Sequence, residues 1–201
     1  MVILFKNIKK PKVLIFDAEY NEGDLIQFSG ILFRNINEEL DLFQIEKSLM
    51  VYCKPAENYV VNPFIERFTG ITSEFLNRKG ISLEETSKVV ACLLDFPEEC
   101  VVVSHGVSND RQVLFENGIN LYENNNKDLT GICTYTMAKR VLDRDKSLSL
   151  KDVAAEAGLF LGDEHNAYND TLITACVLSF LSKIDGGNKE KEGNYGNYES
   201  I

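Results

Sequence analysis

The sequence predicts a single α/β domain in which helices flank a mixed β-sheet. Strand-like apolar runs come first, at residues 13–16 and 25–33, and short apolar runs then alternate with helical patterns. This order is typical of a mixed sheet with helices on its faces. With 201 residues, of which 44% are hydrophobic, the chain can fill the core of one such domain, which we place at residues 1–184.

The strands that open the domain form an expected three-stranded meander. Residues 13–16 are a continuous apolar run, as in a central strand buried on both faces. The turn-like residues 21–24 lead to a second apolar stretch at 25–33, which suits a strand returning beside the first. We expect the third strand within residues 40–51.

Helix signals follow from Thr72 onward. Thr72 caps a short helix, and residues 82–85 form a capping box before apolar residues at helical spacing. Residues 101–104 suit a short buried strand. The helix expected at 110–117 should end at Gly118.

The remainder of the chain contains three further expected helices and a tail. A short strand and a helix are expected at about 131–142, followed by a helix at 150–157. Residues 166–183 are apolar on most sides, so this helix should be buried against the sheet. Residues 185–201 are rich in Gly, Asn and charged residues, which predicts a flexible C-terminal tail.

The composition restricts the expected partners and location. The chain has 21 Lys+Arg against 31 Asp+Glu, a formal net charge of −10, so nucleic acid and anionic membranes should repel it unless a local feature reverses the field. No apolar run approaches the ~18 residues of a membrane helix, and the apolar-then-basic N-terminus reverses the order of a signal peptide. The five cysteines include no CxxC pair. We therefore expect reduced thiols, no membrane partner and a cytoplasmic location.

Two acidic residues, Asp17 and Glu19, directly follow the first buried strand. Residues i and i+2 of a strand face the same way and lie roughly 6 to 7 Å apart, so both carboxylates should project from one face at the strand's end. A solvated strand end is the alternative, because D-x-E triplets are common in so acidic a chain. Acids that directly follow buried residues nevertheless need solvent, a partner or a metal ion.

A second acidic position, Asp110, follows the strand expected at 101–104. It should lie in the first turn of the next helix, where an acid also interacts favourably with the helix dipole, so stabilising the helix end is its alternative role. His105 precedes Asp110 by five residues. We expect His105 to be a core histidine whose ring nitrogens are bonded by the backbone.

The third acidic position opens the last helix, where His165 precedes Asp170 by five residues. Helical side chains lean toward the helix N-terminus, so Asp170 and His165 can border one pocket. The small Ala167 lets the helix approach the sheet closely. The alternative is that Asp170 is an ordinary acid at the N-terminus of the helix and that His165 is an exposed loop histidine.

The three segments together predict a metal site. Four carboxylates in one pocket repel each other by roughly 3 kcal/mol per pair at ~5 Å and an effective dielectric constant of ~20. Two divalent cations cancel this charge, and oxygen-only ligands favour Mg²⁺ or Mn²⁺ over zinc. Such an ion pair stabilises the attacking and leaving oxygens of phosphodiester cleavage, and His165 suits the general base.

These residues resemble the motifs of a known family. Asp17-x-Glu19, Asp110 and His165-x-Ala-x-x-Asp170 are similar in order and spacing to the three motifs of the DEDDh 3′-to-5′ exonucleases. That group contains the proofreading subunit of bacterial DNA polymerase III, ribonuclease T and oligoribonuclease. A histidine five residues before the final aspartate separates this branch from its tyrosine-bearing relatives.

The resemblance covers about residues 12–183 and implies a ribonuclease H-like fold for the exonuclease domain. It implies that His165 is the general base and that four catalytic acids bind the two metal ions: Asp17, Glu19, Asp110 and Asp170. The expected reaction releases 5′-mononucleotides from the 3′ ends of single-stranded DNA or RNA. The alternative is a catalytically silent nucleic-acid-binding or interaction module of the same fold. Several members of the family act as dimers, so a homodimer is also among the expected assemblies.

Substrate contacts are expected beside the acids and in a segment similar to the family's T-G-I-T sequence, which is FTGIT from Phe68 to Thr72 here. The resemblance implies that Ala18 and Tyr20 lie beside the terminal nucleotide. Thr72 and Phe75 are further candidate substrate-binding residues. Tyr20, Phe68 and Phe75 offer rings for base stacking, with ordinary packing as the alternative for the two phenylalanines.

Overall fold

A seven-stranded mixed sheet forms the centre of the protein. In the computed structural model the described residues are 1–95, 99–121, 130–144, 147–159 and 166–192. The strands, in chain order, are β1 (Val2–Leu4), β2 (Lys12–Asn21), β3 (Asp24–Asn37), β4 (Leu42–Lys54), β5 (Ile81–Ser82), β6 (Cys100–Ser104) and β7 (Thr130–Cys133). Their order across the sheet is β1-β4-β3-β2-β6-β7, and β5 pairs with β4. The meander of β2, β3 and β4 is antiparallel, whereas β6 and β7 continue the sheet in parallel with β2.

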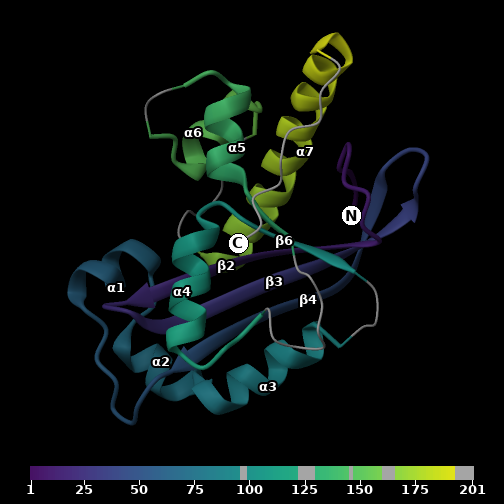
Figure 1. Ribbon diagram of the computed structural model, residues 1–201. Helices are drawn as coiled ribbons and strands as arrows, with labels where there is room; N and C mark the ends of the chain where they lie inside the picture. Colours follow the sequence, from purple (N-terminus) through teal and green to yellow (C-terminus); the bar gives the residue numbers. More distant parts are fainter. Residues whose placement is uncertain (96–98, 122–129, 145–146, 160–165, 193–201) are drawn as a thin grey trace.

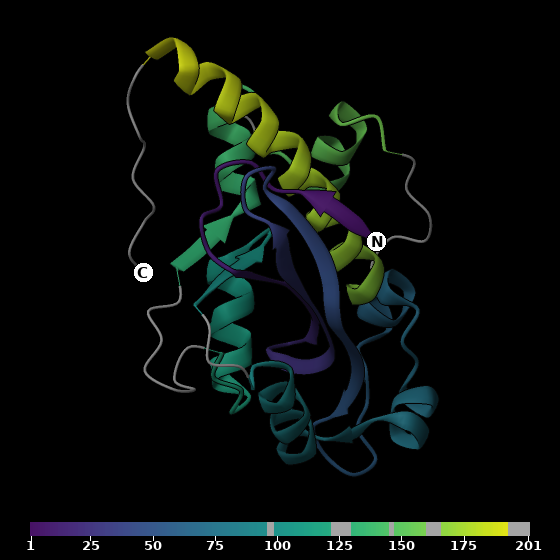
Figure 2. The same cartoon turned by 90° about the vertical axis from the view of Figure 1, so that its right-hand side faces the viewer.

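Seven helices among the described residues surround this sheet. They are α1 (Pro63–Thr69), α2 (Ser73–Lys79), α3 (Leu83–Leu93), α4 (Val107–Glu116), α5 (Thr134–Val141), α6 (Leu150–Glu156) and α7 (Ala167–Glu192). The first two lie at the end of the sheet away from β1, whereas α5 and α6 lie beside α7 (Figures 1 and 2). Within the described part of the chain, none of these helices is long and apolar enough to cross a membrane.

The two faces of β2 contribute to two different cores. The odd-numbered residues Val13 and Ile15 pack with α7, whereas the even-numbered Leu14 packs in the core that α3 and α4 cover. Successive side chains of a strand point to opposite faces. Asp17 and Glu19 continue the odd-numbered series, so the strand's period of two directs both acids to the face that α7 covers.

The expected strands are confirmed, but β2, β3 and β4 each extend beyond the expected residues, and the length of β2 bears on the site. It continues to Asn21 and pairs with β3 as far as Asp24, so Asp17 and Glu19 lie inside the strand and the prediction that they stand at its end was wrong. The physical reason is the tight turn at Glu22 and Gly23, both with positive φ, which keeps the two strands paired almost to their last residues. A register shift between Glu19 and Tyr20 marks a bulge immediately beyond the acids.

The capping signals place several helix starts correctly. Thr72 accepts a hydrogen bond from the Phe75 amide at the start of α2, and Ser82 and Glu85 form the expected capping box of α3. The helix expected at 110–117 begins earlier, at Val107, because Gly106 rather than a residue nearer Asp110 is its N-cap.

Three short elements were not predicted, and the last helix ends later than expected. The unpredicted elements are β1, β5 and α1, although Asn62 before Pro63 is a helix-start signal and the Asn62 side chain accepts a hydrogen bond from Phe64 N. The last helix continues to Glu192, beyond the expected end at 183. Residues 193–201 lie outside the described residues, so the flexibility of the C-terminal tail stays a prediction.

Candidate active site

Three carboxylates from β2 and α7 meet on one face of the sheet. One oxygen each of Asp17, Glu19 and Asp170 can be chosen so that all three lie within 4.8 Å of one another. The strand period places the first two on this face, and Asp170 lies in the first turn of α7, which packs on β2 and β3. The structure therefore brings together three of the four expected acidic ligands, although they are separated by about 150 positions in the chain.

The fourth acid, Asp110, is close to this group but not part of it. It is buried in the first turn of α4, which follows β6 through Ser104 and Gly106. The Ser104 hydroxyl donates a hydrogen bond to Asp110 Oδ2 and accepts one from Gly106 N at 3.1 Å. Ser104 thus fixes the Asp110 side chain, a role that the sequence analysis missed; a serine ending an otherwise apolar strand was the signal available.

Burial and mutual repulsion raise the pKa values of these acids. Burial, followed by the charges of Asp110, Glu19 and Asp170, raises the pKa of Asp17 well above its usual value. Burial, with repulsion from Asp170 and Asp110, raises the pKa of Glu19 to about 7. Burial raises the pKa of Asp110 to about 6 against the opposing effect of the Ser104 hydrogen bond. Carboxylates with such pKa values lack a compensating positive charge.

The donor set fits hard divalent cations. Asp17, Glu19 and Asp170 offer only carboxylate oxygens as ligands. Of the three neighbouring acids, Asp110 raises the pKa of Asp17 the most. Oxygen ligands of this kind suit Mg²⁺ or Mn²⁺, whose charge would offset the repulsion that raises the pKa values.

Of the two histidines, only His105 lies within the described residues. The expectation for His105 is confirmed in part: Nε2 lies 3.1 Å from the Leu148 carbonyl oxygen, but the residue is half-buried and Nδ1 lies 3.0 Å from a side-chain atom, Thr134 Oγ1, rather than from the backbone. Burial lowers the pKa of His105. The other histidine, His165, lies outside the described residues, so its proposed role as general base stays a prediction.

The residues expected beside the terminal nucleotide occupy different environments. Ala18 is buried on the opposite face of β2 from the acids, in the core shared with α3 and α4. Tyr20 is 41% exposed near the end of β2. Asn21, the last residue of the strand, accepts a hydrogen bond from Asn62 N at 2.9 Å and so joins this end of β2 to the start of α1.

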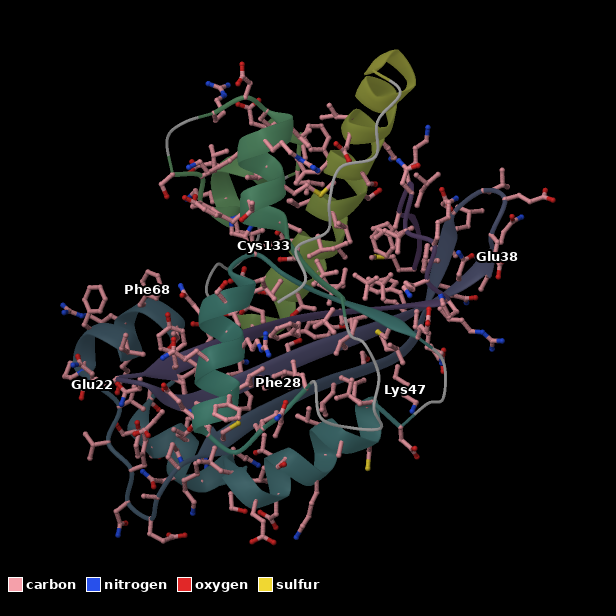
Figure 3. All side chains as sticks on the ribbon, in the orientation of Figure 1. Glu22, Phe28, Glu38, Lys47, Phe68 and Cys133 are labelled. Carbon is pink, nitrogen blue, oxygen red and sulfur yellow. The ribbon has the colours of Figure 1, made fainter. Side chains whose placement is uncertain are left out.

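The T-G-I-T-like segment and its flanking aromatics lie on the helices α1 and α2. Thr72 caps α2, and Phe75 packs edge-on against Tyr52 with ring centroids 4.7 Å apart, in agreement with ordinary packing. Phe68 is 46% exposed and stacks on the exposed Phe64 with centroids 6.0 Å apart (Figure 3). The exposed rings near this end of the sheet therefore come from Tyr20 and α1.

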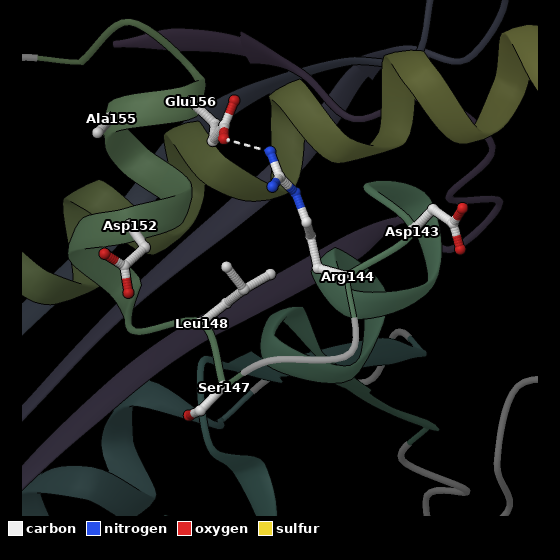
Figure 4. A pocket seen from close by; sticks show the side chains of 7 residues that line it. All are labelled: Asp143, Arg144, Ser147, Leu148, Asp152, Ala155 and Glu156. Atoms are coloured by element: carbon white, nitrogen blue, oxygen red, sulfur yellow. Dashed lines mark hydrogen bonds and ion pairs between the residues drawn. The ribbon is translucent and has the colours of Figure 1, made fainter.

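A separate pocket of about 790 Å³ is lined by residues of α6 and by four residues that precede this helix, Asp143, Arg144, Ser147 and Leu148. An ion pair joins Arg144 and Glu156 of this pocket at 3.1 Å (Figure 4). None of the four acids lines this pocket.

A comparison with models of protein families shows to which family the chain belongs. The family model for exonucleases of the RNase T type matches residues 15–178. The chain belongs to this exonuclease family. The matched segment begins just before Asp17 and ends after Asp170, so it spans the whole cluster of acids.

Individual members of the exonuclease family are distant in sequence. DNA polymerase III subunit epsilon of Aquifex aeolicus is 24% identical over 172 residues, which cover 86% of this chain and 81% of that protein. Exodeoxyribonuclease I of Haemophilus influenzae is 30% identical over 95 residues, covering 45% of this chain and 20% of that protein.

Solved structures confirm the ribonuclease H-like α/β fold of this chain. Exonuclease I of E. coli in complex with a dA16 oligonucleotide matches 90% of this chain and 43% of its own, with a TM-score of 0.70 and 17% identity. The nuclease domain of 3′hExo, a DEDDh family member bound to rAMP, matches 96% of this chain and 100% of its own, with a TM-score of 0.66 and 16% identity. The chain thus spans less than half the length of E. coli exonuclease I.

Proposed function

We propose that this protein is a metal-dependent 3′-to-5′ exonuclease that releases 5′-mononucleotides from single-stranded DNA or RNA. The observation that carries the proposal is the convergence of Asp17, Glu19 and Asp170 on one face of the sheet, inside a chain of the exonuclease family. Three adjoining, partly buried carboxylates repel one another, and divalent cations bound there would offset this repulsion.

In this proposal the acids hold two Mg²⁺ or Mn²⁺ ions. Asp17, Glu19 and Asp170 are the ligands already assembled, and Asp110 joins them from α4 with its orientation set by Ser104. When bound, two such ions supply positive charge to the attacking and leaving oxygens of a phosphodiester. The side chains on β2 and α7 come from rigid elements, so they hold their positions before the substrate arrives.

Proton transfer is assigned to His165. It precedes the first residue of α7 by two positions in the sequence, and Asp170 follows three residues after that helix begins. An unperturbed imidazole has a pKa near the working pH, so it can accept a proton from the attacking water at neutral pH.

The proposed partner is the 3′ end of a single strand. Among the structural neighbours of this chain are an exonuclease bound to an oligonucleotide and a nuclease domain bound to a mononucleotide, which supports nucleic acid as the ligand. Tyr20 and Phe68 are exposed at the end of the sheet where β2 meets α1, and we propose that their rings contact bases of the strand.

End-labelled oligonucleotides of graded length test the proposal directly. DNA and RNA strands with a 5′ label should shorten one nucleotide at a time from the 3′ end with Mn²⁺ or Mg²⁺ and stay intact with EDTA. Circular single-stranded DNA should stay intact under all conditions because it has no end. The matched control is the Asp17→Asn variant, which should leave all substrates uncut.

Two outcomes would overturn the proposal. If every linear strand stays intact with either metal while the protein still binds the strands, the chain is a catalytically silent nucleic-acid-binding module. If circular DNA is cut at the same rate as linear DNA, the activity is endonucleolytic.

A further inference from the structure

The start of α7 depends on one contact from a distant strand. The first four amides of an α-helix have no partner within the helix. At α7, Asn166 Oδ1 accepts from Tyr168 N at 3.1 Å and from Asn169 N at 3.4 Å, and the Asn166 carbonyl accepts from Asp170 N at 3.0 Å. The remaining amide, Ala167 N, donates instead to Gln27 Oε1 on β3 at 3.0 Å.

Gln27 stands directly opposite one of the acids. In the register of β2 and β3, Gln27 pairs with Glu19, and Ser29 pairs with Asp17. Cross-strand partners share a face of the sheet, so Gln27 lies on the same face as the acids, beneath α7. Although its side chain is polar, Gln27 is completely buried, and most of its neighbours along β3 are apolar.

Of the two polar atoms of the Gln27 side chain, Oε1 accepts a hydrogen bond and Nε2 has no partner among the described residues. In the described part of the chain, three buried side-chain atoms have no hydrogen-bond partner in the protein: Gln27 Nε2, Ser29 Oγ and Thr174 Oγ1. Two of the three belong to the residues paired with Glu19 and Asp17. A buried polar atom without a partner destabilises the folded state, so an apolar side chain of similar size would be favoured at position 27 if packing were its only role.

We infer that Gln27 is a positioning residue that ties the start of α7, and with it Asp170, to the strand opposite Glu19, and that its free Nε2 donates to an oxygen of the metal-loaded acid cluster. The inference rests on the proposed metal site. The Gln27 side chain then links both elements that carry the acids. Its Oε1 accepts a hydrogen bond from the first amide of α7, and its Nε2 donates on the side of the cluster that β2 forms. Groups that hold metal ligands in place typically change metal affinity by 10- to 100-fold when removed.

Gln27→Met tests the inference by removing both hydrogen-bonding atoms at nearly constant volume. The metal-free protein should exchange the Ala167 amide hydrogen at least about 10-fold faster, relative to the Leu178 amide in the middle of α7, because Ala167 N loses its acceptor. Calorimetry should show Mn²⁺ binding weakened by about 10-fold or more.

Two further variants make the test specific. Gln27→Glu keeps an oxygen acceptor for Ala167 N, so the exchange of that amide should stay within about 3-fold of the unmodified protein. Thr174→Val is the matched control: it removes a different buried polar atom without a partner in the described chain, the Thr174 hydroxyl of α7, and should leave the Ala167 amide and Mn²⁺ affinity unchanged.

The inference fails if Gln27→Met folds and keeps both the Ala167 protection and the Mn²⁺ affinity. It also fails if Gln27→Glu exposes Ala167 to exchange, which keeps the test decisive should the methionine variant not fold. Absence of Mn²⁺ binding in the unmodified protein would instead contradict the proposed metal site, whereas the Ala167 exchange needs no metal. The two failures are therefore distinguishable.

Discussion

At the residue scale, the acids of the cluster oppose folding when no cation is present. Burial and the charges of three neighbouring acids both raise the pKa of Asp17, which means that its charged form is disfavoured where it stands. We predict that Asp17→Asn abolishes nuclease activity but leaves the melting temperature in EDTA unchanged or higher, because it removes this repulsion. Activity assays and thermal melts check the two halves.

The matched control for Asp17→Asn is Glu84→Gln. Glu84 is an exposed acid of α3 that pairs with Lys88, so its loss should change neither activity nor stability by much. A fall of several degrees in the melting temperature of Asp17→Asn would contradict the prediction and make Asp17 a structural residue.

The same acids predict how the stability of the metal-free protein depends on pH. The pKa of Glu19 is raised from 4.5 to about 7 and that of Asp110 from 3.8 to about 6. Between pH 3.8 and about 7 the folded protein retains protons that the unfolded chain has released, so its stability should fall as the pH rises through this range. Thermal melts in EDTA across this range measure the effect.

The substitution Glu19→Gln should flatten this pH dependence, because it removes one of the titrating groups. Addition of Mn²⁺ at pH 7.5 should reverse the loss in the unmodified protein, since the ion stabilises the charged form. Equal pH profiles of the unmodified protein and Glu19→Gln would show that Glu19 does not titrate in this range.

At the element scale, the junction of β6 and α4 sets the position of the fourth acid. The Ser104 hydroxyl donates a hydrogen bond to Asp110 and accepts one from the Gly106 amide, so it links the end of β6 to the start of α4. We predict that Ser104→Ala weakens Mn²⁺ binding by about 10-fold. Calorimetry measures it, and Ser87→Ala serves as control: this half-buried serine of α3 donates to the Gly118 carbonyl oxygen and not to an acid.

The start of α2 allows a structural role to be separated from a substrate role. Thr72 caps this helix by accepting from Phe75 N at 3.0 Å. Thr72→Ala should therefore lower the free energy of unfolding by about 1 kcal/mol, whereas Thr72→Ser should preserve it because serine also caps well. Chemical denaturation measures both. If Thr72→Ser keeps the stability but raises KM several-fold, Thr72 also contacts substrate.

At the scale of the whole molecule, the charge predicts a small contact area with nucleic acid. Two divalent ions would offset four of the ten net negative charges, and the remainder still repels a phosphate backbone. We predict that KM rises with salt with a log–log slope below about 1.5, corresponding to about two phosphates of a single strand. Strands of 5 and 20 nucleotides should give similar kcat/KM.

Steady-state kinetics at several KCl concentrations and fixed Mn²⁺ measure this slope. A slope above about 3, or a strong preference for the longer strand, would show an extended basic track on the surface and contradict the prediction.

Local chemistry in the sequence determined much of the site. The two-residue spacing of Asp17 and Glu19 places them on one face of a strand, and capping residues such as Thr72 and Ser82 mark helix starts. Such signals act over one to four residues, so they can be identified without knowing the fold. The order of the acidic motifs was also sufficient to indicate the exonuclease family.

Only the tertiary structure decided which side chains meet. The pairing register of β2 and β3 places Gln27 opposite Glu19, and the packing of α7 on those strands brings Asp170 to Asp17 and leaves Asp110 outside the group of three. The Gln27–Ala167 hydrogen bond joins residues 140 positions apart. Register and packing depend on the burial of the whole sheet rather than on any short segment, and a shift of one residue would turn both acids of β2 away from α7.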